Sequence, residues 1–262
     1  MNDLRKVAQV STDTKSAIGG TRMSEAATPA VAAGNRVSTT RIVGGAGVAL
    51  AASVVIENAV LAGAGGPTFG APIKEVLAFA QNRDAVAIAV GLQAMELPLL
   101  LIFVTGLHGL VGRRGAAGTD WSRLAVAAGA TFSAIFALST VSLIGVVLSA
   151  RGLADPTPAF ALVWKLHAAA FALALPVLGT TFIGAALATH ASGLTWPWQR
   201  LLGAAGGSLL LVAGVGNLAI ADGSPLLFVG LLGAAAWLVW LVATGLRLMR
   251  TKADAVRLSE IS

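Results

Sequence analysis

Long runs of apolar positions dominate the chain from about residue 42 onward. Six stretches each reach the roughly 20 predominantly apolar residues that a helix needs to cross a bilayer. They cover residues 42–63, 85–111, 123–150, 158–189, 199–221 and 224–247. A transmembrane β-barrel would instead alternate apolar and polar positions in segments of about ten residues. The pattern therefore predicts an all-α polytopic membrane protein with six transmembrane helices.

The ends of the chain lack this apolar pattern. Residues 1–40 are rich in Ser, Thr, Ala and Gly, a composition that cannot bury a core, so we expect a disordered cytoplasmic tail there. A second cytoplasmic tail is expected at 251–262, which leaves 41–250 as the transmembrane domain. Either Met1 or Met23 could begin the chain, and the sequence leaves that choice open.

The segment between the first two spans predicts a short additional helix. Pro72 suits a first helical turn, and Ile73, Val76, Leu77 and Ala80 recur at helical spacing. An amphipathic helix of this kind lies on a membrane surface with its apolar side in the lipid. We expect an interfacial anchor on the outer surface, with a lid over a cavity as the alternative.

Lys and Arg residues set the expected orientation of the spans. Fourteen of them fall in the tails and loops of one side. The other side receives four, namely Lys74, Arg83, Arg151 and Lys165. Cytoplasmic loops carry the excess of positive charge, so both termini are expected in the cytoplasm of a bacterial cell, with the protein in its cytoplasmic membrane. The net charge of +6 then reflects orientation. The expected partner is the lipid bilayer, and no nucleic acid.

Composition and motifs argue against most catalytic chemistry. Apolar residues make up 56% of the chain and charged residues 11%, against about a quarter charged in soluble domains. The absence of Cys excludes thiolate metal sites and cysteine nucleophiles. No HExxH, phosphate-binding loop or GxSxG sequence is present. His108 and His190 are poor haem ligands, since His190 is expected at the water boundary. We therefore expect no catalytic residue, no bound metal and no cofactor, and nothing favours an enzyme.

Polar residues within the spans carry the remaining functional information. Such groups are costly in hydrocarbon and usually face the protein interior. They are Glu57, Asn58, Gln93, Glu96, Lys165, His167 and Asn217. All are expected in the outer half of the bundle. One hypothesis is a polar cavity that binds or transports a small molecule or ion. The alternative is a membrane scaffold or partner subunit in which these groups only hold the helices together.

Helical spacing separates two of these residues. Lys165 and His167 are two positions apart and point to nearly opposite sides of a helix, so only one faces the centre. Lys165 can extend its long side chain outward, which makes His167 the expected inward group. Two unpaired carboxyls at this depth are unfavourable. Glu57 and Glu96 are therefore expected to share a cation, His167 or Lys165, or to keep one group protonated.

Small residues allow close helix approach in several spans. Gly203 and Gly207 have the spacing that lets two helix backbones meet. Packing within the chain and dimerisation both explain it, so a homo-oligomer or another membrane partner stays open. Trp237 and Trp240 lie deep in the last span and are expected to be packing or lipid-facing residues.

Short motifs of the fourth and fifth spans carry a resemblance. They are Leu166-His167-Ala168, Val177-Leu178-Gly179, Ser192-Gly193-Leu194, Trp196-Pro197-Trp198 and Leu202-Gly203-Ala204. This order resembles a family of uncharacterised six-helix bacterial membrane proteins, known only as a domain of unknown function, over about residues 40–250. The resemblance implies a six-helix architecture and no activity.

Overall fold

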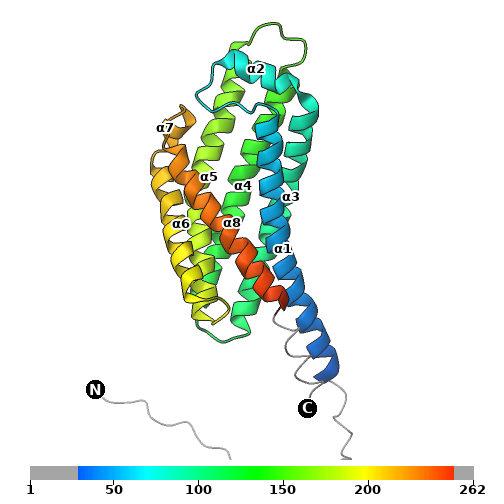
Figure 1. Cartoon of the computed structure of the whole chain (residues 1–262), viewed down its shortest axis with the longest axis vertical. Helices are drawn as coiled ribbons and strands as arrows, with labels where there is room; N and C mark the ends of the chain where they lie inside the picture. The colour runs from blue at the N-terminus through cyan, green and yellow to red at the C-terminus, as the bar shows by residue number, and fades with distance from the viewer. Residues whose placement is uncertain (1–28, 251–262) are drawn as a thin grey trace, which may run out of the picture.

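The structure is a computed structural model that describes residues 29–250, with side chains from residue 39 onward. This part of the chain forms eight helices and no strand. They are α1 (Pro29–Gly63), α2 (Ile73–Gln81), α3 (Arg83–Gly112), α4 (Thr119–Ser149), α5 (Pro158–Ala191), α6 (Pro197–Val215), α7 (Asn217–Ala221) and α8 (Leu227–Arg250). The all-α prediction is confirmed, and Figure 1 shows the long helices packed side by side.

Five helices are long and apolar enough to cross a membrane. They are α3, α4, α5, α8 and the Thr39–Gly63 part of α1. α6 is not among them: its 19 residues include the polar pair Gln199 and Arg200 near its start, which lowers its mean hydropathy. The length and composition of the helices thus support a multi-pass membrane protein with five clear candidate spans.

Two helix boundaries differ from the sequence prediction. The stretch 199–221 is not one helix, because α6 ends at Val215 and Gly216 separates it from α7. Glycine is a poor helix former, and Gly214 and Gly216 flank the break. α1 begins at Pro29, a residue favoured in a first turn, so residues 29–40 of the expected tail are helical. The rest of both predicted tails, including Met23, lies outside the described residues.

The six long helices form a closed ring. α1 packs against α3, α3 against α4, α4 against α5, α5 against α6, and α6 against α8. α8 then returns to α1 and closes the ring. α2 lies across one end of it, here named the α2 end, where the α4–α5 connection and α7 also lie (Figure 1). The opposite end carries the α3–α4 and α5–α6 connections.

Glycine pairs let neighbouring helix backbones touch. A Cβ on Gly207 of α6 would lie 2.8 Å from the carbonyl oxygen of Gly179 on α5. One on Gly203 would overlap the Cβ of Ala186, also on α5. The small-residue spacing of α6 therefore serves packing within the chain. α1 and α8 cross in the same way at Gly44 and Gly245, where either added Cβ would lie 2.6 Å from the other residue's carbonyl oxygen.

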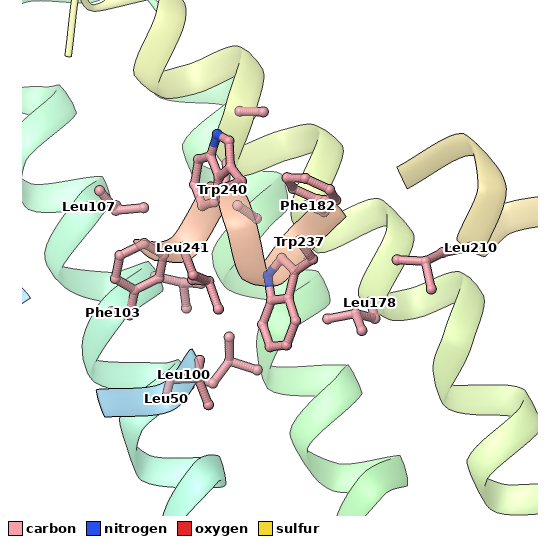
Figure 2. Close-up of a cluster of buried hydrophobic side chains, with 14 of the residues drawn as sticks. Leu50, Leu100, Phe103, Leu107, Leu178, Phe182, Leu210, Trp237, Trp240 and Leu241 are labelled. Atoms are coloured by element: carbon pink, nitrogen blue, oxygen red, sulfur yellow. The ribbon is translucent and has the colours of Figure 1, made fainter. Parts of the chain in front are cut away.

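Aromatic side chains fill the half of the ring away from α2. Trp240 of α8 is fully buried between two rings that it meets edge-on. Its centroid lies 5.9 Å from that of Phe103 on α3 and 5.5 Å from that of Phe182 on α5. We name these three residues the aromatic plug (Figure 2). Trp237 is also buried, so both tryptophans of α8 are packing residues.

The short helix α2 is present, but its apolar face does not lie in lipid. Val76, Leu77, Phe79 and Ala80 are buried in a cluster that includes residues of α3, α4 and α5, such as Trp164. Lys74 pairs with Asp155 in the α4–α5 connection at 3.2 Å. α2 therefore covers the end of the bundle. This corrects the expected interfacial anchor in favour of the lid arrangement.

Candidate functional site

A cavity of about 420 Å³ lies inside the ring at the α2 end. Its walls come from α1, α2, α3, α4, α5, α8 and the 64–72 segment, and they are mostly apolar. The aromatic wall residues are Phe69, Phe79, Phe132, Phe136, Trp164, Phe171 and Trp237. Leu50, Leu100, Leu178 and Trp237 also belong to the core cluster of Figure 2, so the packed core forms the floor. The cavity is therefore closed toward the aromatic plug.

Buried polar side chains from α1 and α3 meet in this cavity. The Gln93 Nε2 donates a hydrogen bond of 2.5 Å to the Glu57 Oε1, and the carboxyls of Glu57 and Glu96 interact with each other. Gln93 and Glu96 are each only 6% exposed. Their Oε1 atoms have no hydrogen-bond partner in the structure. Buried acceptors are nearly always satisfied, so these two oxygens await a donor that the chain does not supply.

His167 contributes from α5. Its Nδ1 lies 2.9 Å from the backbone oxygen of Ser139 on α4 and 3.0 Å from the Ser139 hydroxyl. A carbonyl oxygen can only accept, so Nδ1 carries the hydrogen, and in the neutral ring Nε2 is an acceptor. His167 therefore presents an acceptor to the cavity that it lines. Its ring packs 5.2 Å from that of Trp164 and 5.8 Å from that of Phe69.

The structure brings together five of the seven residues singled out in the sequence. Glu57, Asn58, Gln93, Glu96 and His167 all line the cavity. Asn58 is exposed and donates to the Val54 oxygen of its own helix at 2.8 Å. Asn217 begins α7 and is not part of the cavity wall.

Lys165 lies outside the cavity. Its Nζ bonds Asp222, after α7, at 2.7 Å, and both side chains are largely exposed. This hydrogen bond and the lysine charge lower the pKa of the Asp222 carboxyl below its usual value. The choice of His167 as the inward group agrees with this geometry. The expected ion pair is not formed, because neither Glu57 nor Glu96 has a cationic partner among residues 39–250.

Sequence reasoning missed several residues that build the site. Ser139 positions the His167 ring, and Phe69 packs over Trp164 and Phe171 with centroids 5.9 and 5.3 Å away. Trp164 precedes His167 by three positions and so shares its helix face, which is a signal the sequence contains. Phe69 lies in a Gly- and Pro-rich segment without periodicity, so nothing in the sequence indicated its contacts.

The cavity reaches the protein surface between α1 and α8. Several of its lining residues are also exposed: Asn58 and Ala62 on α1, Gly66 and Thr68 after it, and Leu231 on α8. The two helices cross at Gly44 and Gly245 and diverge toward the α2 end (Figure 1). We name the gap bounded by Asn58, Ala62 and Leu231 the lateral opening. Val55 and Ile56, beside it on α1, are more than half exposed, which suits contact with lipid.

Charge is distributed unequally between the two ends of residues 39–250. The α2 end holds six acidic residues, Glu57, Glu75, Asp84, Glu96, Asp155 and Asp222, and four basic ones, Lys74, Arg83, Arg151 and Lys165. The opposite end holds one acidic residue, Asp120, and seven arginines, at positions 41, 113, 114, 123, 200, 247 and 250. The cavity therefore lies at the acidic end.

The chemistry that this site supports is proton exchange and recognition of donors. Two carboxyls, an amide oxygen and an imidazole nitrogen converge on one apolar cavity, and all of them can accept hydrogen bonds. Among residues 39–250 no group of three or more His, Asp and Glu side chains is arranged to hold a metal ion. The chain matches no protein-family model, no curated protein and no solved structure.

Proposed function

We propose that this chain is a multi-pass protein of the bacterial cytoplasmic membrane that binds or transports a small molecule or ion in its outer-half cavity. The observation that carries the proposal is the unfilled volume of about 420 Å³, which is lined by the buried polar residues Glu57, Gln93, Glu96 and His167. Ligand sites are typically apolar cavities of about 300–1,000 Å³ with a few convergent polar groups. Polar groups that served only as a scaffold would satisfy one another and leave no such space.

Six spans fit the ring better than five. α6 lies between α5 and α8, and at about 1.5 Å per residue its 19 residues extend about 28 Å, close to the roughly 30 Å of a bilayer core. Val212 and Val215 of α6 are exposed apolar side chains, which suits contact with lipid. We therefore propose α6, with α7 at its end, as the remaining span.

The α2 end is proposed to face outward. Seven arginines gather at the opposite end among the described residues, and the exposed Trp121, Trp196 and Trp198 lie there as interfacial tryptophans do. A reporter fused after Ser262 should be active only in the cytoplasm, and one inserted beside Arg151 only outside. In the six-span arrangement three spans, α5, α6 and α8, separate the two positions and place them on opposite sides of the membrane. Activity of both reporters on the same side would contradict it.

Carbodiimide labelling tests whether the cavity is an accessible site. Dicyclohexylcarbodiimide dissolves in membranes and forms stable adducts with protonated carboxyls in apolar surroundings. We expect adducts on Glu57 or Glu96, located by mass spectrometry of the purified protein. The double variant Glu57→Gln/Glu96→Gln should lose them, whereas Glu75→Gln, at an exposed position on α2, should keep them.

The scaffold alternative predicts the opposite labelling result. Carboxyls sealed between helices would stay unmodified while the exposed Glu75 and Asp84 reacted with a water-soluble carbodiimide. That outcome, obtained with folded protein, would overturn the proposed binding function.

A further inference from the structure

The acidic pair of the cavity has no cation of its own. Its carboxyls, Glu57 and Glu96, interact directly, and His167 is the only other titratable group among the described lining residues of α1, α2, α3, α4, α5, α8 and the 64–72 segment. Two adjacent carboxyls in apolar surroundings disfavour the doubly ionised form, and net charge inside a membrane is costly. Without a ligand, the pair therefore stays neutral by holding its protons.

The polar residues that line the cavity favour a positively charged ligand. The Oε1 atoms of Gln93 and Glu96 are unpaired, and the Nε2 of His167 is an acceptor. No lysine or arginine among the described residues lines the cavity. An anion would therefore find no cationic side chain to balance its charge here. A cation would satisfy these acceptors and replace one proton of the acidic pair.

The rest of the cavity suits an apolar body. Phe69, Trp164 and Phe171 form a packed aromatic group beside His167. Aromatic faces attract cations by about 0.5–2 kcal/mol in general, and they also pack against apolar groups. A small inorganic cation would leave most of these apolar walls without a contact. The combination fits an organic cation with an aromatic or aliphatic body.

Access and charge point to the same ligand. The lateral opening faces the surface that α1 and α8 present to lipid, next to the exposed Val55 and Ile56. With the pair protonated, the α2 end keeps four acidic and four basic residues, so it does not repel a cation as the arginine-rich opposite end would. A ligand that dissolves in the membrane and carries a positive charge can therefore reach the cavity from the outer leaflet.

We propose that the cavity takes a lipophilic monovalent organic cation through the lateral opening, in exchange for one proton of the Glu57–Glu96 pair. Before exchange the pair is fully protonated and neutral. After exchange the two carboxyls share the remaining proton, the bound cation balances their single negative charge, and the released proton leaves to water. This inference rests on the proposed binding function and names its ligand class.

A pair of isosteric probes tests the charge requirement on the purified full-length protein in detergent. Benzyldimethylammonium, which carries one N–H donor, and isobutylbenzene have the same shape and differ in charge. Binding is followed by the fluorescence of Trp164 and Trp237, which line the cavity, with empty micelles as the blank. The cation should bind at least tenfold more tightly than the neutral compound. Because one proton is released, cation binding should tighten by about tenfold for each unit rise in pH over the range in which the free pair holds both protons.

Matched variants assign the effect to the acidic pair. The double variant Glu57→Gln/Glu96→Gln keeps the shape of both side chains but has no carboxyl proton to release. It should weaken cation binding by at least about thirtyfold and remove the proton release and the pH dependence. Glu75→Gln, at an exposed position at the same end, should change nothing. If the double variant fails to fold, either single variant should shift the pH dependence of cation binding. The wild-type proton release, measured in weakly buffered solution, is independent of either variant.

The outcomes separate this inference from the proposed function. Equal binding of the two probes without proton release would overturn the cation exchange and leave a small-molecule site standing. Binding of neither probe would likewise overturn it, and the carbodiimide result would then decide whether the cavity is a site at all.

Discussion

Replacing Trp240 by alanine is expected to lower the free energy of unfolding by about 3–5 kcal/mol, the usual cost of truncating a large buried aromatic side chain. Trp240 is fully buried and meets Phe103 and Phe182 edge-on, so the variant removes the centre of the aromatic plug. The close packing of three ring helices around it leaves little room for collapse. Reversible unfolding in mixed micelles with increasing dodecyl sulfate would measure the change.

Trp240→Phe is the matched control for this effect. It retains an aromatic ring and removes the indole Nε1–H, which has no hydrogen-bond partner in the structure. An unsatisfied buried donor is unfavourable, so its removal offsets part of the lost contact area, and a loss of about 1 kcal/mol is expected. If the alanine and phenylalanine variants were equally stable, the plug would not be a packed core.

Gly44→Ala is expected to destabilise the protein by about 1–3 kcal/mol, the cost of overpacking a tight contact. The added Cβ would lie 2.6 Å from the Gly245 carbonyl oxygen and 2.9 Å from the Met249 Cγ on α8. The backbone oxygen cannot rotate away, so α1 and α8 must separate. Because their crossing sets where the helices diverge, the lateral opening should change as well, which the probe affinities would report.

The neighbouring glycine, Gly45, provides a control for which the free energy of unfolding should not fall. A Cβ on Gly45 would meet nothing within 4 Å. Alanine is favoured over glycine in a helix interior by about 1 kcal/mol, so Gly45→Ala should be neutral or stabilising in the same unfolding experiment. Equal destabilisation by both variants would show that α1 and α8 do not cross at Gly44.

Hydrophobic periodicity predicted the helices well because membrane spans are defined by local composition. The spans expected at 85–111 and 158–189 correspond closely to α3 and α5. The break at Gly216 was missed because the apolar run continues across it, and only the local backbone shows the interruption. α2 was found by its spacing, but whether its apolar side met lipid or protein depends on tertiary packing with Leu143 and Phe160.

The candidate site was partly predictable for a similar reason. Intramembrane polar residues must face inward, so the sequence alone predicts that Glu57, Glu96 and His167 lie in one region. Their partners could not be predicted, since the Gln93–Glu57 contact and the Ser139–His167 contact join different helices. Lys165 and His167 were expected at a similar depth in the membrane, so depth did not distinguish them. The hydrogen bond of Lys165 to Asp222 depends on where α7 ends, which the sequence pattern does not show. Contacts between distant parts of the chain carry the information that local patterns lack.

Closure of the helix ring has a consequence for biosynthesis. Five of the six contacts in the ring join long helices that are consecutive in the sequence. The sixth contact, between α8 and α1, joins the last long helix to the first. Translation delivers α8 last, so a nascent bundle of the preceding helices is an open arc whose inner, carboxyl-lined side is exposed to lipid. Docking of Gly245 onto Gly44 converts this arc into a closed compartment. A chain that stalls before α8 presents buried acidic groups to the bilayer, which is the kind of defect that membrane quality-control proteases recognise.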